Sequence, residues 1–319
     1  MLLMRKVPKM STLLNNLPAY LIRGLATGGQ FALVAIGYTM VYGILKLINF
    51  AHGDLFMVSG ILLIYLNAEM PGIVSSLGLP LSGTAVILIS ILIMIILTVV
   101  IGYFIEKCAY SPLRQAPRMS VMISAIGVSY LLQNLVCYIT GGLSKQFPDV
   151  PVLSDSVKLF GVKDKVSVFA SPIVAVILMG ILVVVINHTK FGMSMRAVSK
   201  DFETSQLMGI KLNKVISITF GIGAFLAAVG SVLYFSKNTG INHLAGSTPG
   251  IKAFIAAVVG GIGSVPGAVV GALIIGVVES LARALDLSDF SDVISFALLI
   301  IILVVKPTGI FGEKTTEKV

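Results

Sequence analysis

The stretch HTKFGMSMRAVSKDFETSQLMGIKLNK, at His188–Lys214, is the longest polar, mixed-charge run of the chain. Continuous apolar segments lie on both sides of it, at about residues 168–186 and 215–235. Each apolar segment is close to the length that a helix needs to cross a bilayer, so the polar run is a loop between two membrane spans. Its five basic residues favour the cytoplasmic side.

A short helix is predicted inside this loop. Ser199 can act as its N-cap, and Asp201 and Glu203 then fall in the first turn, where acidic groups suit the positive end of the helix dipole. Gly209 stands where a left-handed residue often follows a helix. The helix carries apolar residues among polar neighbours, at Phe202, Leu207 and Met208. We therefore expect a docking surface, with an ordinary connector as the alternative.

The composition points to the same class of protein. The 319 residues are 56% hydrophobic and 12% charged, and the mean hydropathy is +1.01. Soluble domains carry about 25% charged residues, so this chain is predicted to be an all-α polytopic membrane protein. The apolar runs are continuous rather than alternating, which excludes a β-barrel. The net charge of +9 is then a matter of membrane orientation and does not indicate nucleic-acid binding.

The apolar runs predict about eight or nine membrane segments within a single transmembrane domain, residues 1–319, with residues 11–23 as a separate interfacial helix. The predicted segments cover residues 24–45, 55–66, 81–104, 121–139, 168–186, 215–235, 252–285 and 293–305. Two are interrupted, and the blocks 24–139 and 215–305 each give four segments in opposite orientation. Inverted repeats with broken helices are typical of transporters, so these blocks are candidates for such a repeat.

The first interruption, KLINFAHGD at Lys46–Asp54, places Asn49, His52 and Asp54 between apolar runs. Polar groups at membrane depth are costly unless they line a cavity or pair within the protein. We expect a discontinuous helix on a translocation path, and the equal alternative is that these residues cap helix ends at the membrane interface. One His and one Asp do not form a metal site.

The second interruption is GGIGSVPG at Gly260–Gly267. Glycine and proline oppose helix, so an irregular intramembrane segment is predicted there, whereas Gly271 and Gly276 are expected to serve helix packing. Glu279 and Asp292 fall near span ends and are expected at the interface. Two further polar residues, Gln133 and Asn134, are expected to bond between helices.

Orientation follows from the basic loops. The segments 105–119, 188–214 and 306–319 contain three, five and three Lys and Arg residues, whereas 286–292 contains three Asp and no base. The positive-inside rule places the first three in the cytoplasm, and 140–166 and 286–292 outside. The 140–166 loop has four lysines, but three aspartates accompany them and a long loop follows the rule less strictly.

Four stretches resemble the permease subunits of branched-chain amino acid ABC importers, the LivH-type family. They are YTMVYGILKLINFAHGD at Tyr38–Asp54, RAVSKDFETSQLMGI at Arg196–Ile210, KAFIAAVVGGIGSVPGAVVGALIIGVVES at Lys252–Ser280 and KPTGIFG at Lys306–Gly312. They occur in order and extend the resemblance from about Gly24 to Gly312. The Met1–Met10 extension and the 140–166 loop match no motif of the family.

The resemblance implies a multi-pass subunit of the inner membrane with several partners. These are a second, homologous permease, two cytoplasmic ATPase subunits that bind ATP and Mg, and an extracytoplasmic amino-acid-binding protein. The lipid bilayer surrounds the two permeases. The sequence contains no P-loop, so this chain is expected to bind no cofactor and to be a transport subunit, not an enzyme. The resemblance also implies that the helix at residues 196–210 couples the permease to an ATPase.

The residues expected to take part fall in two sets. ATPase coupling is assigned to Phe191, Gly192, Arg196, Ala197, Asp201, Phe202, Glu203, Leu207 and Gly209. The translocation path is assigned to Tyr38, Asn49, His52, Gly53, Asp54, Gly260, Gly261 and Gly263. Catalytic and metal-binding residues are not expected.

Three other functions stay open. An ion-coupled secondary transporter or channel acting alone would use His52, Asp54 and Glu279 as coupling groups. The same importer class could carry another amino acid, an amide or urea, because an apolar cavity separates close homologues by only about 1–3 kcal/mol. A membrane-embedded enzyme is disfavoured because the sequence shows no nucleophile–base or metal cluster.

Overall fold

A computed structural model describes residues 10–78, 80–114, 116–159 and 161–312 of the chain. Among these residues, eight helices are long and apolar enough to cross a membrane, two of them counted together with adjoining turns. They are α1 (Met10–Leu45), α2 (His52–Ser76), α3 (Gly83–Ile105), α4 (Arg118–Thr140), α5 (Val166–His188), α8 (Leu212–Phe235), α10 (Val265–Ala284) and α11 (Ser291–Val305). The predicted all-α polytopic membrane protein is confirmed. The Met1–Met10 extension lies almost entirely outside the described residues.

Shorter elements connect these helices. The helical ones are α6 (Lys190–Lys200), α7 (Phe202–Leu207), α9 (Ser247–Gly260), the π-helical turn η1 (Glu106–Tyr110) and the 3₁₀ turns η2 (Ser111–Leu113) and η3 (Ser288–Phe290). Two small antiparallel pairs complete the fold: β1 (Lys145–Gln146) with β4 (Gly240–Ile241), and β2 (Ser156–Leu159) with β3 (Val162–Lys165).

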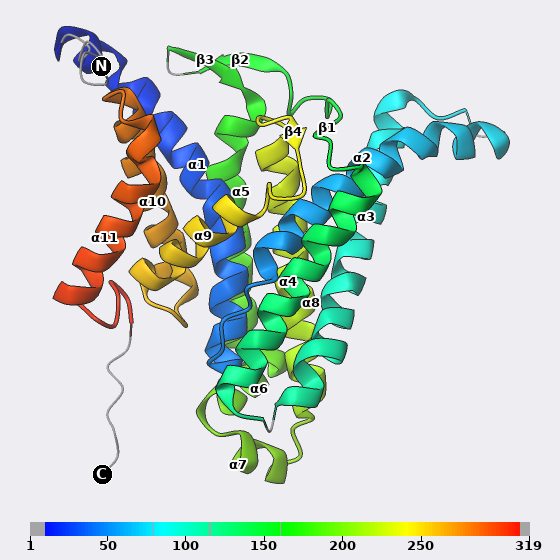
Figure 1. Cartoon of the computed structure of the whole chain (residues 1–319), viewed down its shortest axis with the longest axis vertical. Helices are drawn as coiled ribbons and strands as arrows, with labels where there is room; N and C mark the ends of the chain where they lie inside the picture. Colours follow the sequence, from blue (N-terminus) through cyan, green and yellow to red (C-terminus); the bar gives the residue numbers. More distant parts are fainter. Residues whose placement is uncertain (1–9, 79, 115, 160, 313–319) are drawn as a thin grey trace.

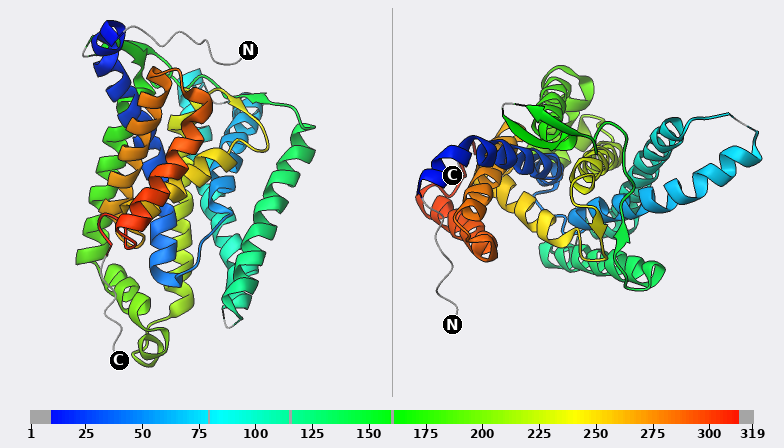
Figure 2. Two further views of the ribbon diagram at one scale, coloured as in Figure 1. Left: turned by 60° about the vertical axis from the view of Figure 1, so that its left-hand side comes forward. Right: turned by 90° about the horizontal axis from the view of Figure 1, so that it is seen from above.

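The two ends of the helix bundle carry different loops (Figure 1). The helices α6 and α7 and the turn between α3 and α4 lie at one end, whereas the segment after α11 lies part-way along the bundle (Figure 1, Figure 2). The strands β2 and β3, the start of α1 and the turn between α10 and α11 lie at the other end. The basic loops 105–119 and 188–214 therefore lie together, with the 140–166 and 286–292 loops at the opposite end, as the charge pattern predicts.

The interior of the bundle is formed by α1, α8 and α10. In the most apolar part of α1, 83% of the residues are buried, against 6% in α11. Glycines allow the inner helices to touch through their backbones: a Cβ added at Gly28 of α1 would lie 2.7 Å from Leu273 Cα of α10. The expected packing role of Gly276 is confirmed, since a Cβ there would lie 2.2 Å from Gly28 N.

The start of the first span was predicted wrongly, and α2 extends to Ser76 where the second span was expected to end at residue 66. Residues 11–23 do not form a separate interfacial helix, because α1 is continuous from Met10 to Leu45 with Pro18 inside it. Tertiary contact holds this first part against α10, where the Ser280 hydroxyl donates to the Tyr20 carbonyl at 2.6 Å. Local propensity alone would have ended the helix near Pro18.

The helix contacts agree with the proposed inverted repeat. α1 packs against α8, α9 and α10, whereas α8 packs against α1, α2 and α3. In the same way α2 contacts α4, and α9 contacts α11. If α1, α2, α3 and α4 correspond to α8, α9, α10 and α11 in that order, each helix has the same main neighbours as its counterpart. A repeat related by a two-fold axis requires this agreement.

Candidate functional site

The first interruption separates α1 from α2. After α1 ends at Leu45, Lys46 adopts a left-handed backbone with φ of 54°, which is costly for a residue other than glycine. Figure 1 shows the chain turning back into the bundle, so that α2 begins part-way along the length of α1. Asn49, His52 and Asp54 are all buried. The interpretation as a discontinuous helix is therefore supported over helix caps at the membrane interface.

Asn49 and Asp54 are held by side chains from other helices. The Tyr110 hydroxyl donates to Asn49 Oδ1 at 2.7 Å. Asp54 accepts from Ser129 Oγ at 2.5 Å and from Gln133 Nε2 at 3.0 Å, both on α4. Because Asp54 is in the first turn of α2, its carboxylate also lies at the positive end of the helix dipole.

The cluster extends to a third helix. Gln133 Nε2 lies 3.5 Å from the Ser247 hydroxyl at the start of α9, which is a weak bond at the limit of hydrogen-bonding distance. Ser129, Gln133 and Ser247 are each half-buried, so the cluster reaches the edge of the bundle. The expected interhelical role of Gln133 is confirmed. For Asn134 it is wrong, because its amide donates to the Tyr130 carbonyl of its own helix at 2.8 Å.

His52 fills a slot between α1 and α8. A Cβ at Gly37 would lie 2.2 Å from His52 Nε2, and a Cβ at Gly223 would lie 3.4 Å from its Cε1. The Tyr38 ring packs edge-on against the imidazole, with centroids 4.9 Å apart. Nε2 is buried and has no hydrogen-bond partner among the described residues. Packing against small residues thus fixes the first residue of α2.

The starts of α2 and α9 meet inside the bundle. A Cβ at Gly53 would lie 2.9 Å from both the Gly246 carbonyl oxygen and Gly250 Cα. The Tyr38 hydroxyl is beside the same contact, 3.4 Å from the Cβ position of Gly250. Two helix N-termini therefore converge here, and five residues of the predicted path come together: Tyr38, Asn49, His52, Gly53 and Asp54.

The second interruption separates α9 from α10 and is shorter than predicted. The helix continues to Gly260 and resumes at Val265, so only residues 261–264 are irregular. Gly261 and Gly263 have φ of 106° and 102°, a conformation open to glycine but strained for other residues. The Ser264 hydroxyl then accepts from Gly267 N at 3.2 Å and caps α10. The predicted break between two helices is confirmed.

The chain after α11 closes this second interruption, which sequence reasoning missed. Ile310 N donates to the Val259 carbonyl and Phe311 N to the Gly260 carbonyl, each at 2.9 Å. These carbonyls belong to the last turn of α9, which would otherwise lack partners. Gly260 therefore neighbours the α10 backbone and Gly261 the returning chain, rather than the polar side chains around His52, whereas a Cβ at Gly263 would meet no atom within 4 Å. The KPTGIFG motif was the available signal.

The docking loop contains two helices instead of the single predicted one. Asp201, not Ser199, is the N-cap of α7, and its Oδ1 accepts from Glu203 N at 2.9 Å and Thr204 N at 3.2 Å. The Thr204 hydroxyl and the same backbone groups lower the pKa of the Asp201 carboxyl, so it stays ionised at the helix N-terminus. Ser199 instead lies in α6, where its hydroxyl donates to the Arg196 carbonyl.

The residues assigned to ATPase coupling divide between these helices. Those on α6 attach it to α5: Arg196 donates to the Ile186 carbonyl, and a Cβ at Gly192 would lie 2.1 Å from the same oxygen. Phe191 and Ala197, also on α6, are half-buried. On α7, Asp201 and Glu203 are exposed, and Gly209 beyond it has φ of 82° as expected.

The apolar residues of α7 face two directions. Leu207 and Met208 are 87% and 79% exposed, as a docking surface requires. Phe202 was expected beside them but is half-buried against the core. It lines a cavity of about 1100 Å³ together with Leu45 and Leu47, at the start of the first interruption, and with Arg114 after α3. One cavity therefore connects α7 to the start of the α1–α2 interruption.

A charge cluster near the opposite end was not predicted. Lys252 of α9 is 3.0 Å from Glu279 Oε1 and 2.8 Å from Asp292 Oδ1, and Arg283 also pairs with Glu279. Glu279 is 3% exposed and lies inside the bundle, whereas Asp292 is exposed. Lys252 makes the burial of Glu279 tolerable, because a buried charge needs a partner. An ion-coupled transporter was expected to use His52, Asp54 and Glu279. Glu279 belongs to this charge cluster, whereas His52 and Asp54 lie at the first interruption.

The described part of the chain contains no group of three or more His, Cys, Asp or Glu residues arranged to hold a metal ion. The candidate site is therefore built from hydrogen bonds, packing and a cavity.

Comparisons with known proteins give a consistent result. The model of the family described as branched-chain amino acid transport system / permease component matches residues 20–303. The chain is 38% identical over 305 residues to the high-affinity branched-chain amino acid transport system permease protein LivH of Escherichia coli strain K12, covering 94% of this chain and 96% of that protein.

Two further relatives are similar over the same length. LivH of Salmonella typhimurium is 40% identical over 307 residues, covering 94% of this chain and 96% of the relative. The permease protein BraD of Pseudomonas aeruginosa is 40% identical over 305 residues, covering 94% and 97%. No solved structure matches the chain.

Proposed function

Since this chain belongs to the family of permease components of branched-chain amino acid transport systems, we propose that it carries branched-chain amino acids inward across the cytoplasmic membrane by alternating access. Its named relatives are high-affinity permease proteins for this class of solute, and the alignments cover nearly their whole length. The family and the eight apolar helices make the chain a multi-pass transport subunit of a larger system.

The proposal includes the partners that such a subunit needs. The sequence has no P-loop, so the energy comes from two ATPase subunits that bind ATP and Mg on the cytoplasmic side. A second, related permease completes the membrane unit, and an extracytoplasmic binding protein delivers the amino acid. The exposed Leu207 and Met208 of α7 offer the apolar contact for an ATPase groove.

One observation carries the mechanism: α7 and the α1–α2 interruption line the same cavity. A partner that moves α7 shifts Phe202 relative to Leu45 and Leu47. The strained Lys46 is the hinge on this route, since it joins the end of α1 to the returning chain. Movement transmitted through this segment reaches the N-terminus of α2.

The N-terminus of α2 carries the polar groups of the proposed path. Asp54 bonds to Ser129 and Gln133 of α4, and Gln133 reaches Ser247 of α9. A shift of α2 therefore changes the contacts among three helices at once. Such a polar cluster in a membrane bundle is a site for a polar solute or for gating groups, and the zwitterionic part of an amino acid needs such partners.

The test replaces Phe202 by Ala in the complete importer, reconstituted in liposomes with its ATPases and binding protein. The ratio of leucine taken up to ATP hydrolysed should fall about tenfold, because the side chain that connects α7 to the interruption is lost. Phe296→Ala on the exposed face of α11 is the matched control and should leave this ratio unchanged. Normal coupling in Phe202→Ala, or a loss of assembled complex with no change in the ratio, would contradict the mechanism.

Orientation has its own test. Ser156→Cys in β2 and Gln206→Cys in α7 are both exposed positions at opposite ends of the bundle. In a background without Cys108 and Cys137, a membrane-impermeant thiol reagent added to intact cells should label only Ser156→Cys. Labelling of Gln206→Cys instead would place α7 away from ATP and exclude the coupling role.

A further inference from the structure

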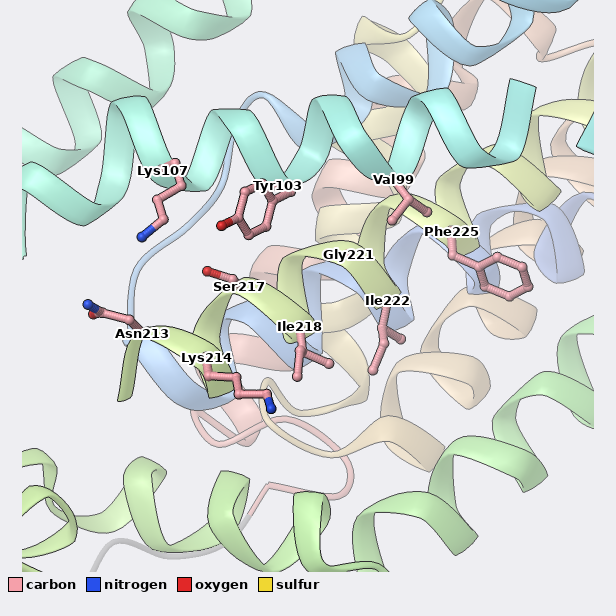
Figure 3. Close-up of a pocket in the computed structure, with 10 residues that line it drawn as sticks. All are labelled: Val99, Tyr103, Lys107, Asn213, Lys214, Ser217, Ile218, Gly221, Ile222 and Phe225. Carbon is pink, nitrogen blue, oxygen red and sulfur yellow. The ribbon is translucent and has the colours of Figure 1, made fainter. Parts of the chain in front are cut away.

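A groove lies between α3 and α8 on the outside of the bundle, away from the α1–α2 interruption (Figure 3). Its volume is about 670 Å³. Figure 3 shows two chemically different ends: Lys107 and Asn213 lie at one, where the Lys214 side chain begins and runs along α8 toward Ile218, and Ile222 and Phe225 lie at the other. Lys107 and Asn213 adjoin the end of the bundle that carries α6 and α7, which is the cytoplasmic end in the proposed orientation.

The basic end of the groove carries positive charge that no acidic side chain in the described part of the chain neutralises. Lys107 and Lys214 are exposed, and neither forms an ion pair among the described residues. The neighbouring carboxylate, Glu106, is already occupied: it pairs with Arg114 and accepts from Ser217 Oγ at 2.6 Å. The groove mouth thus presents two cations with no neutralising acid of its own.

The rest of the groove is apolar, and its floor at Gly221 lacks a side chain. A Cβ at Gly221 would meet only Val99 Cγ1, at 3.6 Å. Ile218 and Tyr103 form partly exposed walls, and Figure 3 shows the Tyr103 hydroxyl directed toward the basic end. A tyrosine with its ring on apolar groups and its hydroxyl near a polar region is typical of the membrane interface.

We propose that this groove binds an anionic phospholipid of the cytoplasmic leaflet. Its phosphate lies between Lys107 and Lys214, and one acyl chain follows the floor at Gly221 toward Phe225. Charge complementarity selects this occupant: basic pockets between membrane helices on the cytoplasmic side bind anionic headgroups, and long lysine side chains reach the headgroup level. An apolar helix of a partner would leave both ammonium groups without an anion.

The first experiment measures lipid selectivity by native mass spectrometry on the full-length chain in detergent, with equal amounts of phosphatidylglycerol and phosphatidylethanolamine. The wild type should retain phosphatidylglycerol preferentially. Lys107→Gln combined with Lys214→Gln should weaken that binding about tenfold, since each lysine near an anionic headgroup contributes to the attraction. The matched control is Lys158→Gln combined with Lys163→Gln, which removes the same charge from exposed positions in β2 and β3 at the opposite end. It should bind as the wild type does.

A second variant tests the apolar part without changing charge. Gly221→Phe should fill the groove and reduce phosphatidylglycerol retention to the level of the double lysine variant. Gly180→Phe in α5 is its control, because a Cβ at Gly180 meets no atom within 4 Å and the residue is exposed.

Each of three results with the isolated chain would overturn the proposal, and a fourth comes from the assembled importer. The three are equal retention of the two lipids by the wild type, unchanged selectivity in the double lysine variant, and equal effects of Gly221→Phe and Gly180→Phe. In the assembled importer, loss of the second permease from Gly221→Phe with normal lipid retention would identify the groove as a protein interface and reject it as a lipid site. Inorganic phosphate added at equal concentration should not displace the bound lipid, since the acyl chain supplies part of the binding.

Discussion

The two helix interruptions occupy similar places in the two halves of the chain, yet they are closed by different chemistry. The α1–α2 interruption is filled by polar side chains, with Asn49 bonded to Tyr110 and Asp54 bonded to Ser129 and Gln133. The α9–α10 interruption is closed by backbone, from Gly267 on one side and the returning chain at Ile310 and Phe311 on the other.

This difference indicates different roles. Side-chain hydrogen bonds between helices can exchange partners when a helix moves, so the first interruption suits a moving part. Glycine backbone contacts leave no room for adjustment, and a break held in this way is a fixed joint. The first interruption also shares a cavity with α7, whereas residues 261–264 of the second line neither that cavity nor the groove between α3 and α8.

The largest expected effect is at the fixed joint. A Cβ in Gly260→Ala would lie 1.9 Å from the Gly267 carbonyl oxygen, so α9 and α10 must separate. We expect a loss of about 3 kcal/mol in folding free energy, measured as thermal stability in detergent. Gly127→Ala, at an open position on α4, should be neutral or slightly stabilising. Similar stability of the two variants would remove the distinction between the joints.

The next effect concerns the returning chain. Ile310→Pro removes the N–H that bonds to the Val259 carbonyl and should cost about 2 kcal/mol, because a carbonyl at the end of α9 loses its partner. Ile310→Ala keeps the N–H and is the control. If both variants unfold at the same temperature, the side chain rather than the hydrogen bond holds the segment.

At the first interruption we expect loss of transport rather than loss of fold. Asp54→Asn removes a charge while keeping the shape, and leucine uptake by the complete importer should fall about tenfold, equivalent to about 1.4 kcal/mol. The amount of protein in the membrane should stay normal, and the exposed Asp155→Asn should transport normally. Uptake at the wild-type level would remove Asp54 from the path.

The smallest effect is expected at Asn49. Tyr110→Phe deletes the hydroxyl that donates to Asn49 Oδ1 and should reduce thermal stability by about 1 kcal/mol. The reference is Tyr138→Phe, where the side chain is 87% exposed. A loss as large as that of Gly260→Ala would mean that the first interruption is as rigid as the second.

The sequence by itself determined the class of protein, the approximate places of the membrane segments and the position of both interruptions. These are local properties: a run of apolar residues sets a span, a density of glycine and proline opposes helix, and basic loops set orientation. The sequence also located the docking loop. The N-cap there is Asp201 rather than the predicted Ser199, and the loop contains two helices rather than one.

Tertiary structure decided what each interruption does, because that depends on residues far apart in the chain. Gln133 and Asp54 are separated by 79 positions, and Glu279 is neutralised by Lys252 from another helix. The single helix α1 continues through Pro18 because of its contact with α10. No local pattern shows that the chain after α11 returns to close α9, since the free carbonyls of Val259 and Gly260 and the N–H groups that bond to them come together only when the bundle packs.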